Sequence, residues 1–396
     1  MPKFSHCNIF TVEIFHQQNE VYQTWKNVLP EGHYLLSSEY HVLENSLLDG
    51  FRYYYVNIYD KNKQLIALFY FQLIALKSEN FKTKSCVETS MLKFMMGFKN
   101  NHLMVCGNVF KVNQPGYFFI NQADTSHLTD LILKIKKQIS NKYRILGILL
   151  KDCSNHINVQ FYTCNAFVPF NEDITMMLNI KPKWQTIGDY CESLKRKYKQ
   201  RFQKVKNSAS SLNIRELNST EIEANKIELE KLYTNVLDKQ SFTLGKINAN
   251  YFVEMKKHLA DNFKIFAYFK ENEIIAFSSH IQYPKENEME IHYIGINYLY
   301  NQEYQLYFNI LCDGVKLAIE NRFDRLELGR TAKDAKANLG AIPLFNHNYI
   351  WLKSRFLRSM LRIVINQQSK NEDKDWLNRQ PFKMIDSSVD KAVNIQ

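Results

Sequence analysis

The chain has 396 residues, and its 51 Lys and Arg against 40 Asp and Glu give a formal net charge of +11 at pH 7. This length is too great for one small core and suggests two or three domains. The 45% hydrophobic and 23% charged residues are typical of a soluble globular protein and exclude disorder over most of the chain. The positive excess indicates acidic partners: a phosphate-bearing cofactor, tRNA or an anionic membrane surface.

The cysteine spacing and the apolar runs indicate the cellular compartment and whether a metal site is expected. The seven cysteines are scattered without a C-x-x-C pair, so metal and redox motifs have no support and reduced thiols fit best. Residues 1–6 lack the apolar core of a signal peptide. The longest apolar run, Leu65 to Leu76, is well short of the ~20 residues that span a bilayer. We expect a cytoplasmic protein with no metal.

The first half predicts a hairpin followed by helix–strand units. Aromatic and β-branched residues favour strands at 51–59 and 65–76, joined by a polar turn. The other expected elements are a strand at 7–14, a helix at 38–48, a helix at 88–98, a short strand ending at Gly107, a helix at 128–139 and a strand at 143–150.

This pattern recurs in the second half. Strands at 263–269 and 274–281 repeat the hairpin, and residues 319–326 match 139–146 across a helix-to-strand junction. Helices are also expected at 221–237 and 250–262. The two repeats together predict duplication of one unit, and hence an α/β (α+β) fold with two mixed, mostly antiparallel sheets flanked by helices.

Between the halves, residues 193–207 predict a strongly basic helix. Leu194, Tyr198, Phe202 and Val205 fall on one face. Seven Lys and Arg residues crowd the rest, among them Lys195, Lys199 and Arg201. Such a helix could be a solvated connector between domains, or it could bind a phosphate chain or an RNA backbone.

A third strand, residues 289–296, carries the candidate catalytic side chains. Strict alternation places Glu290 and His292 on one face and Tyr293 on the other. Glu327 lies on the polar face of a later strand, residues 325–328, after a helix at 305–320. If these groups converge, His292 beside a carboxylate could act as a base, and Tyr293 could protonate a leaving group. A hydrogen-bonded structural histidine and a packing tyrosine are the alternatives.

The turn after this strand is the candidate anion site. Gly329 breaks the strand, and Thr331 is a plausible N-cap for a short helix that Gly340 would end. Free N–H groups at a helix start suit a phosphate, and Arg330 and Lys336 would add charge-assisted contacts. The alternative is an ordinary strand-to-helix connection.

The chain closes with a strand at 349–352 and an amphipathic segment at 354–367. That segment either packs back on the domain or contacts a membrane surface, which would make the protein membrane-peripheral. We therefore divide the chain into an N-terminal domain, 1–180, a C-terminal domain opened by the basic helix, 181–352, and an extension, 353–396.

These patterns resemble the FemAB-like branch of the GNAT acyltransferases. The resemblance rests on residues 194–206 leading to Ile214, on Tyr293-Ile294-Gly295-Ile296, on residues 328–332 and on Lys336-x-x-Leu339-Gly340. It implies two tandem GNAT-like domains and transfer of an acyl or aminoacyl group from a thioester or aminoacyl-tRNA to an amine by direct attack. From their own residues, we expect the turn at 329–331, Lys336 and the basic helix to bind a phosphate-bearing donor.

This sequence departs from the GNAT pattern at one point that affects the identity of the acyl donor. The glycine-rich loop that binds the pyrophosphate of coenzyme A in simple GNAT enzymes is absent after Ile296, where Asn297-Tyr298-Leu299-Tyr300-Asn301-Gln302 stands. Acyl carrier protein and aminoacyl-tRNA therefore stay open as donors beside coenzyme A, and DNA is not an expected partner. The rival hypothesis is a non-catalytic GNAT module that binds tRNA or an anionic lipid headgroup.

Overall fold

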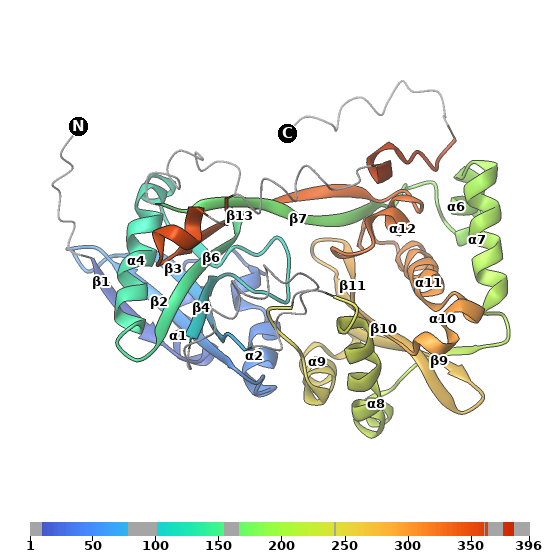
Figure 1. Cartoon of the computed structure of the whole chain (residues 1–396), viewed down its shortest axis with the longest axis horizontal. Coiled ribbons are helices and arrows are strands. Elements are labelled where there is room, and N and C mark those ends of the chain that lie inside the picture. The colour runs from blue at the N-terminus through green and yellow to red at the C-terminus, as the bar shows by residue number, and fades with distance from the viewer. Residues whose placement is uncertain are drawn as a thin grey trace. The chain divides into compact units, whose positions relative to one another are not determined.

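The computed structural model describes residues 10–77, 101–153, 166–240, 243–359, 361–362 and 375–383 (Figure 1). Contacts within the chain divide it into two units with interleaved segments. Unit 1 takes residues 1–174, 237–260 and 345–372, and unit 2 takes 175–236, 261–344 and 373–396. The chain therefore passes between the units several times.

Unit 1 is built on a sheet with strand order β1-β2-β3-β4-β6-β13. Neighbouring strands are antiparallel except for β4 and β6, which are parallel, and β5 pairs with β3. The strands are β1 (Thr11–Phe15), β2 (Phe51–Tyr59), β3 (Leu65–Ala75), β4 (Asn101–Cys106), β5 (Tyr117–Phe119), β6 (Arg144–Cys153) and β13 (Ile342–Leu352).

Helices cover both faces of the unit 1 sheet because β2 alternates apolar side chains on both sides. Tyr54, Val56 and Ile58 join the main core with the buried side of α4 (Leu128–Ile139). On the other side, Trp25 of α1 (Gln18–Lys26) packs on Tyr55 with ring centroids 5.6 Å apart. Also in unit 1, α2 (Ser38–Asn45) packs against α9 (Ala249–Leu259).

Unit 2 repeats this topology. Its sheet has the order β7-β12-β11-β10-β9-β8, again with one parallel pair, β11 and β12. The strands are β7 (Val168–Asn179), β8 (Asn213–Glu216), β9 (Phe263–Lys270), β10 (Glu273–Tyr283), β11 (Glu288–Ile296) and β12 (Arg325–Glu327). The series β8 to β12 matches β1, β2, β3, β4 and β6 in order and direction, so the predicted duplication is confirmed.

The last strand of each series comes from another part of the chain. Strand β7 follows β6 in the sequence but pairs with β12, whereas β13 follows β12 but pairs with β6. The helices of unit 2 are α6 (Ile187–Ser193), α7 (Arg196–Ser208), α8 (Ser219–Leu237), α10 (Tyr298–Tyr304), α11 (Leu306–Glu320) and α12 (Lys333–Ala337). Short 3-10 turns lie at Tyr34–Leu36, Gln122–His127, Ala260–Asn262 and Asp375–Asn378.

Most predicted elements agree with the structure within a few residues, and α4 and β2 agree at both ends. The sequence missed α1, α6, α10, β5, β7 and β8, and it made the closing strand, now β13, too short. The predicted helix at 88–98 lies outside the described residues. In the C-terminal segment, residues 355–359 and 361–362 are helical and 363–367 are not described. Of the described helices, none is long and apolar enough to cross a membrane.

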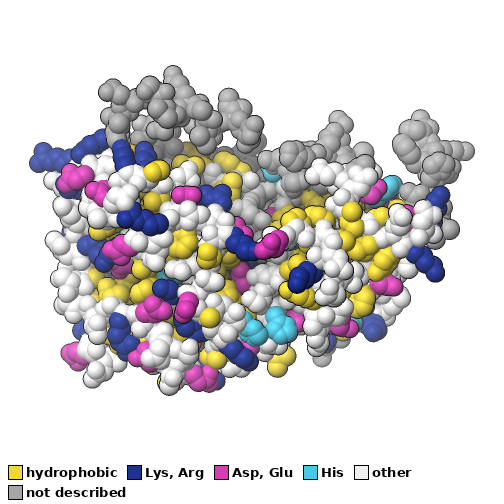
Figure 2. All heavy atoms as spheres, turned by 180° about the vertical axis from the view of Figure 1, so that it is seen from behind, with side chains coloured by type: hydrophobic (Ala, Val, Ile, Leu, Met, Phe, Trp, Pro, Cys, Tyr) yellow, Lys and Arg dark blue, Asp and Glu magenta, His cyan; other side chains and the backbone are white. Residues whose placement is uncertain are grey.

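Charged side chains of both signs are interspersed on the face shown in Figure 2. The net positive charge is therefore not gathered into a single patch on that face. The strongest local concentration of Lys and Arg in the sequence is on α7, whose Phe202 and Val205 are buried as the apolar stripe predicts.

Candidate functional site

The parallel strands of unit 2 separate after a short contact. Strands β11 and β12 pair only from Glu288–Arg325 to Glu290–Glu327. Beyond that point the chain after β12 stays with β7, since Leu328 donates to Met176 at 2.9 Å and Met176 donates to Gly329 at 3.1 Å. Strand β11 instead continues along β10 to Ile296. The two strands therefore form a fork, with Glu290 and Glu327 at its base.

Strand β11 carries a β-bulge beside this fork. Ser278 pairs with Ile294 but His280 pairs with Ile291, so β11 has one extra residue between Ile291 and Ile294. The bulge changes the predicted alternation: Ile291 faces Gly314 of α11, whereas Tyr293 packs on Tyr233 of α8 at 5.1 Å. Bulges re-aim side chains and are frequent next to active sites.

Glu290 and His292 form a buried pair. The His292 Nδ1 and the Glu290 Oε1 are 2.6 Å apart, and Tyr283 of β10 donates its hydroxyl to the Glu290 Oε2 at 3.0 Å. The His292 side chain is only 1% exposed and its ring lies 4.2 Å from that of Tyr293. The carboxylate thus fixes the orientation of the imidazole in a water-poor environment.

Lys336 is a buried cation on the β12 side of the fork. It is 2% exposed, and a Cβ on Gly329 would lie 3.9 Å from its Nζ. Burial lowers the pKa of Lys336 to about 7, although the charge of Glu327 opposes this shift. A lysine that titrates near neutral pH can both hold and release a proton under working conditions.

The turn at the start of α12 differs from the prediction. Ala332, with φ +52°, is the N-cap in place of Thr331. The helix ends at Ala337, and Gly340, with φ +92°, closes the turn that follows, since Gly340 donates to Ala337 at 3.0 Å and Ala341 to Lys336 at 3.2 Å. The N-cap prediction was wrong because Ala332 adopts the left-handed conformation that a turn this tight needs, which the sequence did not signal. Arg330 is half-buried and Thr331 is exposed. Binding of an anion by Gly329, Arg330 and Thr331 stays a prediction.

Several cations of α7 have partners within unit 2. Lys199 forms an ion pair with Glu192, Lys206 one with Asp313, and the Arg201 guanidinium lies 5.0 Å above the Phe308 ring. Lys195 is the N-cap residue, so it lies at the helix boundary. Acidic residues outside α7 thus reduce part of the electrostatic repulsion among the Lys and Arg side chains of this helix. The role of Lys195, Lys199 and Arg201 in donor binding stays a prediction.

The equivalent strands in unit 1 do not separate in this way. Strands β4 and β6 stay paired from Asn101–Arg144 to Cys106–Leu150. Buried ion pairs lie in the same unit, between Lys111 and Glu39 at 2.6 Å and between Lys151 and Asp152 at 2.9 Å. Of these two parallel pairs, the pair in unit 2 is the shorter: β11 and β12 pair over three residues before they separate.

Comparisons with known proteins were made at the level of sequence and of structure. No family model matches the sequence, and no curated protein matches it. FemX, in contrast, superposes with a TM-score of 0.50 over 88% of this chain and 99% of its own, at 9% identity. The chain therefore shares the fold of FemX.

Two further solved structures are similar at lower scores. A tandem GNAT protein from the clavulanic acid biosynthesis pathway has a TM-score of 0.46 and 7% identity, covering 87% of this chain and 99% of that one. L-PGS from Bacillus licheniformis has a TM-score of 0.44 and 12% identity, covering 84% and 96%.

Within this fold, the predicted residues lie on both sides of the fork. His292 contacts Glu290, Glu327 is the strand partner of Glu290, and Lys336 lies beside Gly329 on the β12 side; their joint role in catalysis stays a prediction. Sequence reasoning missed Tyr283, whose signal would have been its place on β10 opposite Glu288. Among the described residues, no group of three or more His, Cys, Asp or Glu could hold a metal.

Proposed function

We propose that the chain transfers an acyl or aminoacyl group from an ester or thioester donor to an amine at the fork of unit 2. The observation that carries this proposal is the buried Glu290–His292 pair on β11, at the point where β11 and β12 separate. On the β12 side lies the buried Lys336, whose pKa burial lowers to about 7. Acyl transfer needs a proton acceptor for the amine and a proton donor for the leaving group. These residues supply both.

The reaction proceeds by direct attack. The amine nitrogen forms a bond to the acyl carbon, and the bond from that carbon to the donor oxygen or sulfur breaks. With Nδ1 of His292 protonated and donating to Glu290, Nε2 carries the lone pair that takes the amine proton. The Lys336 ammonium gives its proton to the leaving oxygen or sulfur. A base and an acid with pKa values near the working pH are the most efficient.

The donor is proposed to bear phosphate, as the net charge of +11 and the basic helix α7 favour. After Ile296 the chain forms α10, whose N-cap side chain, that of Asn297, accepts from Leu299 at 3.1 Å. This segment replaces the glycine-rich loop that binds pyrophosphate, so we favour acyl carrier protein or aminoacyl-tRNA over coenzyme A. The name FemX and the tandem GNAT neighbour are consistent with a transferase at this coarse level.

The test is to incubate the full chain with acyl-CoA, acyl carrier protein and aminoacyl-tRNA donors and a mixed amine pool, and to identify products by mass spectrometry. With the active donor in hand, His292→Gln should lower kcat by about 10²–10⁴-fold. Lys336→Met should lower kcat to a similar degree and leave the KM for the amine within a few fold. Lys316→Gln, an exposed position on α11, is the matched control and should match the wild type.

Two outcomes would count against the proposal. Wild-type kcat in both His292→Gln and Lys336→Met would remove these residues from the chemistry. No product from any donor, with retained binding of tRNA or anionic lipid vesicles, would favour the non-catalytic binding module.

A further inference from the structure

Unit 1 contains a cavity of about 600 Å³ that the transfer chemistry does not use. It lies where β1 ends: β1 pairs with Tyr55–Tyr59 only, so the preceding residues of β2 line the cavity instead of a strand partner. The C-terminal ends of α2 and α4 form its walls. This volume is typical of sites for small molecules.

The lining combines aromatic rings with charges of both signs. The aromatic residues are Phe51, Tyr53, Tyr54 and Tyr143. The charged residues are Glu44, Arg52 and Lys142. Arg52 and Lys142 are both exposed residues, and the Arg52 guanidinium lies 5.2 Å above the Tyr143 ring. The cavity therefore presents one carboxylate and two cations around an apolar body.

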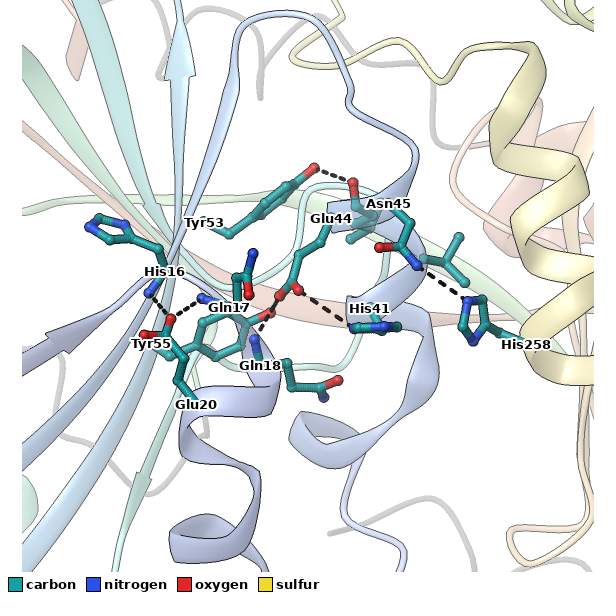
Figure 3. A network of polar contacts seen from close by, with 12 residues as sticks. His16, Gln17, Gln18, Glu20, His41, Glu44, Asn45, Tyr53, Tyr55 and His258 are labelled. Carbon is teal, nitrogen blue, oxygen red and sulfur yellow. Dashed lines mark hydrogen bonds and ion pairs between the residues drawn. The ribbon is translucent and has the colours of Figure 1, made fainter.

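Glu44 is held in place by its neighbours (Figure 3). Its Oε1 accepts from the Tyr55 hydroxyl and, at 3.0 Å, from the backbone N–H of Gln18. Its Oε2 faces the His41 Nδ1 at 3.6 Å, too long for a good hydrogen bond. The side chain is 10% exposed, so a fixed and nearly buried carboxylate keeps acceptor capacity on Oε2.

A single class of ligand satisfies all three features. An ammonium group would meet Glu44, and the partial negative charge at the C-terminal ends of α2 and α4 favours the same cation. An anionic group would meet Arg52 and Lys142, and an apolar or aromatic body would fill the space between the rings. We propose that this cavity binds a small zwitterionic amine, a compound with an ammonium group and a carboxylate or phosphate. All lining residues belong to unit 1, so the site does not depend on the proposed transfer reaction.

The test uses matched probes and calorimetric titration of the full chain. L-phenylalanine carries both charges, phenethylamine lacks the carboxylate and 3-phenylpropionate lacks the ammonium group. L-phenylalanine should bind at least about tenfold more tightly than either, because each loses one charge-assisted contact. O-phosphoethanolamine distinguishes a phosphate-bearing source from an amino acid.

Variants assign each charge to its residue. Glu44→Gln keeps an acceptor for Tyr55 and should abolish the preference for L-phenylalanine over 3-phenylpropionate. Arg52→Met should abolish the preference for L-phenylalanine over phenethylamine. Lys137→Met, an exposed change on α4 outside the cavity lining, should bind like the wild type. Thermal melts confirm that each variant is folded.

The proposal is overturned if none of L-phenylalanine, L-leucine and O-phosphoethanolamine binds at 10 mM. It is also overturned if folded Glu44→Gln and Arg52→Met proteins keep the wild-type order of probe affinities. Loss of acyl transfer in other variants leaves this readout unchanged, so the two proposals fail separately.

Discussion

At the scale of the residue, burial decides what Lys336 can do. An exposed lysine at the end of α12 would be a permanent cation. Lys336 is instead 2% exposed beside Gly329, and this burial lowers its pKa to about 7. The same burial costs stability, because the charged form loses its hydration.

The pH dependence of stability tests this environment. Lys336 has a pKa of about 7 in the folded chain and 10.5 as a free group, so between these values the unfolded chain binds more protons. Its contribution to the free energy of unfolding therefore rises with pH through this window, by up to about 1.4 kcal/mol per pH unit. Lys336→Met lacks this contribution. Its free energy of unfolding should therefore rise relative to that of the wild type as pH falls from 9.5 to 7.

Urea unfolding of both proteins at several pH values gives the comparison. Parallel curves of unfolding free energy against pH would show that Lys336 titrates as an ordinary lysine.

At the scale of the element, close packing restricts single positions in strands. A Cβ added at Gly295 of β11 would lie 2.2 Å from the Phe277 ring and 2.7 Å from the Cβ of Leu232. Gly295→Ala should therefore destabilise the chain by about 1–3 kcal/mol. Gly188→Ala in α6 is the matched change: it meets only the Thr186 hydroxyl at 3.3 Å, and it should be neutral or stabilising by up to ~1 kcal/mol. Thermal melts of both variants distinguish the two sites, and equal shifts would contradict this packing.

Helix α7 carries a second prediction at this scale. Arg196, Lys197 and Lys204 are exposed, whereas Lys199 and Arg201 contact Glu192 and Phe308. Changing Lys195, Lys199 and Arg201 together to Gln should weaken binding of the phosphate-bearing donor and flatten its salt dependence, because fewer counterions are released. Loss of the Lys199 pair should cost at most about 1 kcal/mol. The control variant changes Arg196, Lys197 and Lys204 together to Gln. It removes the same positive charge and leaves the contacts of Lys199 and Arg201 in place.

The readout is donor affinity at several salt concentrations for both triple variants. If both keep the wild-type affinity and salt slope, α7 is only a connector.

At the scale of the whole molecule, duplication allows the two units to differ. Unit 2 has the separated strands and the candidate catalytic groups, whereas unit 1 has a continuous parallel pair and buried ion pairs. We expect a substitution at a buried ion pair of unit 1 to lower stability, and a substitution at the candidate catalytic groups of unit 2 to lower kcat. Lys111→Met removes the ammonium beside the buried Glu39 and should cost about 3–5 kcal/mol with kcat unchanged.

Glu290→Gln in unit 2 should instead lower kcat and leave stability within about 1–2 kcal/mol, because the amide still accepts from Tyr283. Thermal melts and initial rates on both variants check this division. A large loss of kcat in folded Lys111→Met would assign unit 1 to the reaction.

The sequence by itself determined the elements and their duplication. Periodicity placed β2, α4 and α11 within a residue or so, since alternation and the 3.6-residue repeat are local properties. It also placed Glu290, His292 and Glu327 on neighbouring strands. The tertiary structure alone decided three features: the bulge in β11, the exchange of β7 and β13, and the burial of Lys336. Each depends on which residues meet across distant parts of the chain. Pairing partners and hydration are set by those contacts, and no local pattern of residues encodes them.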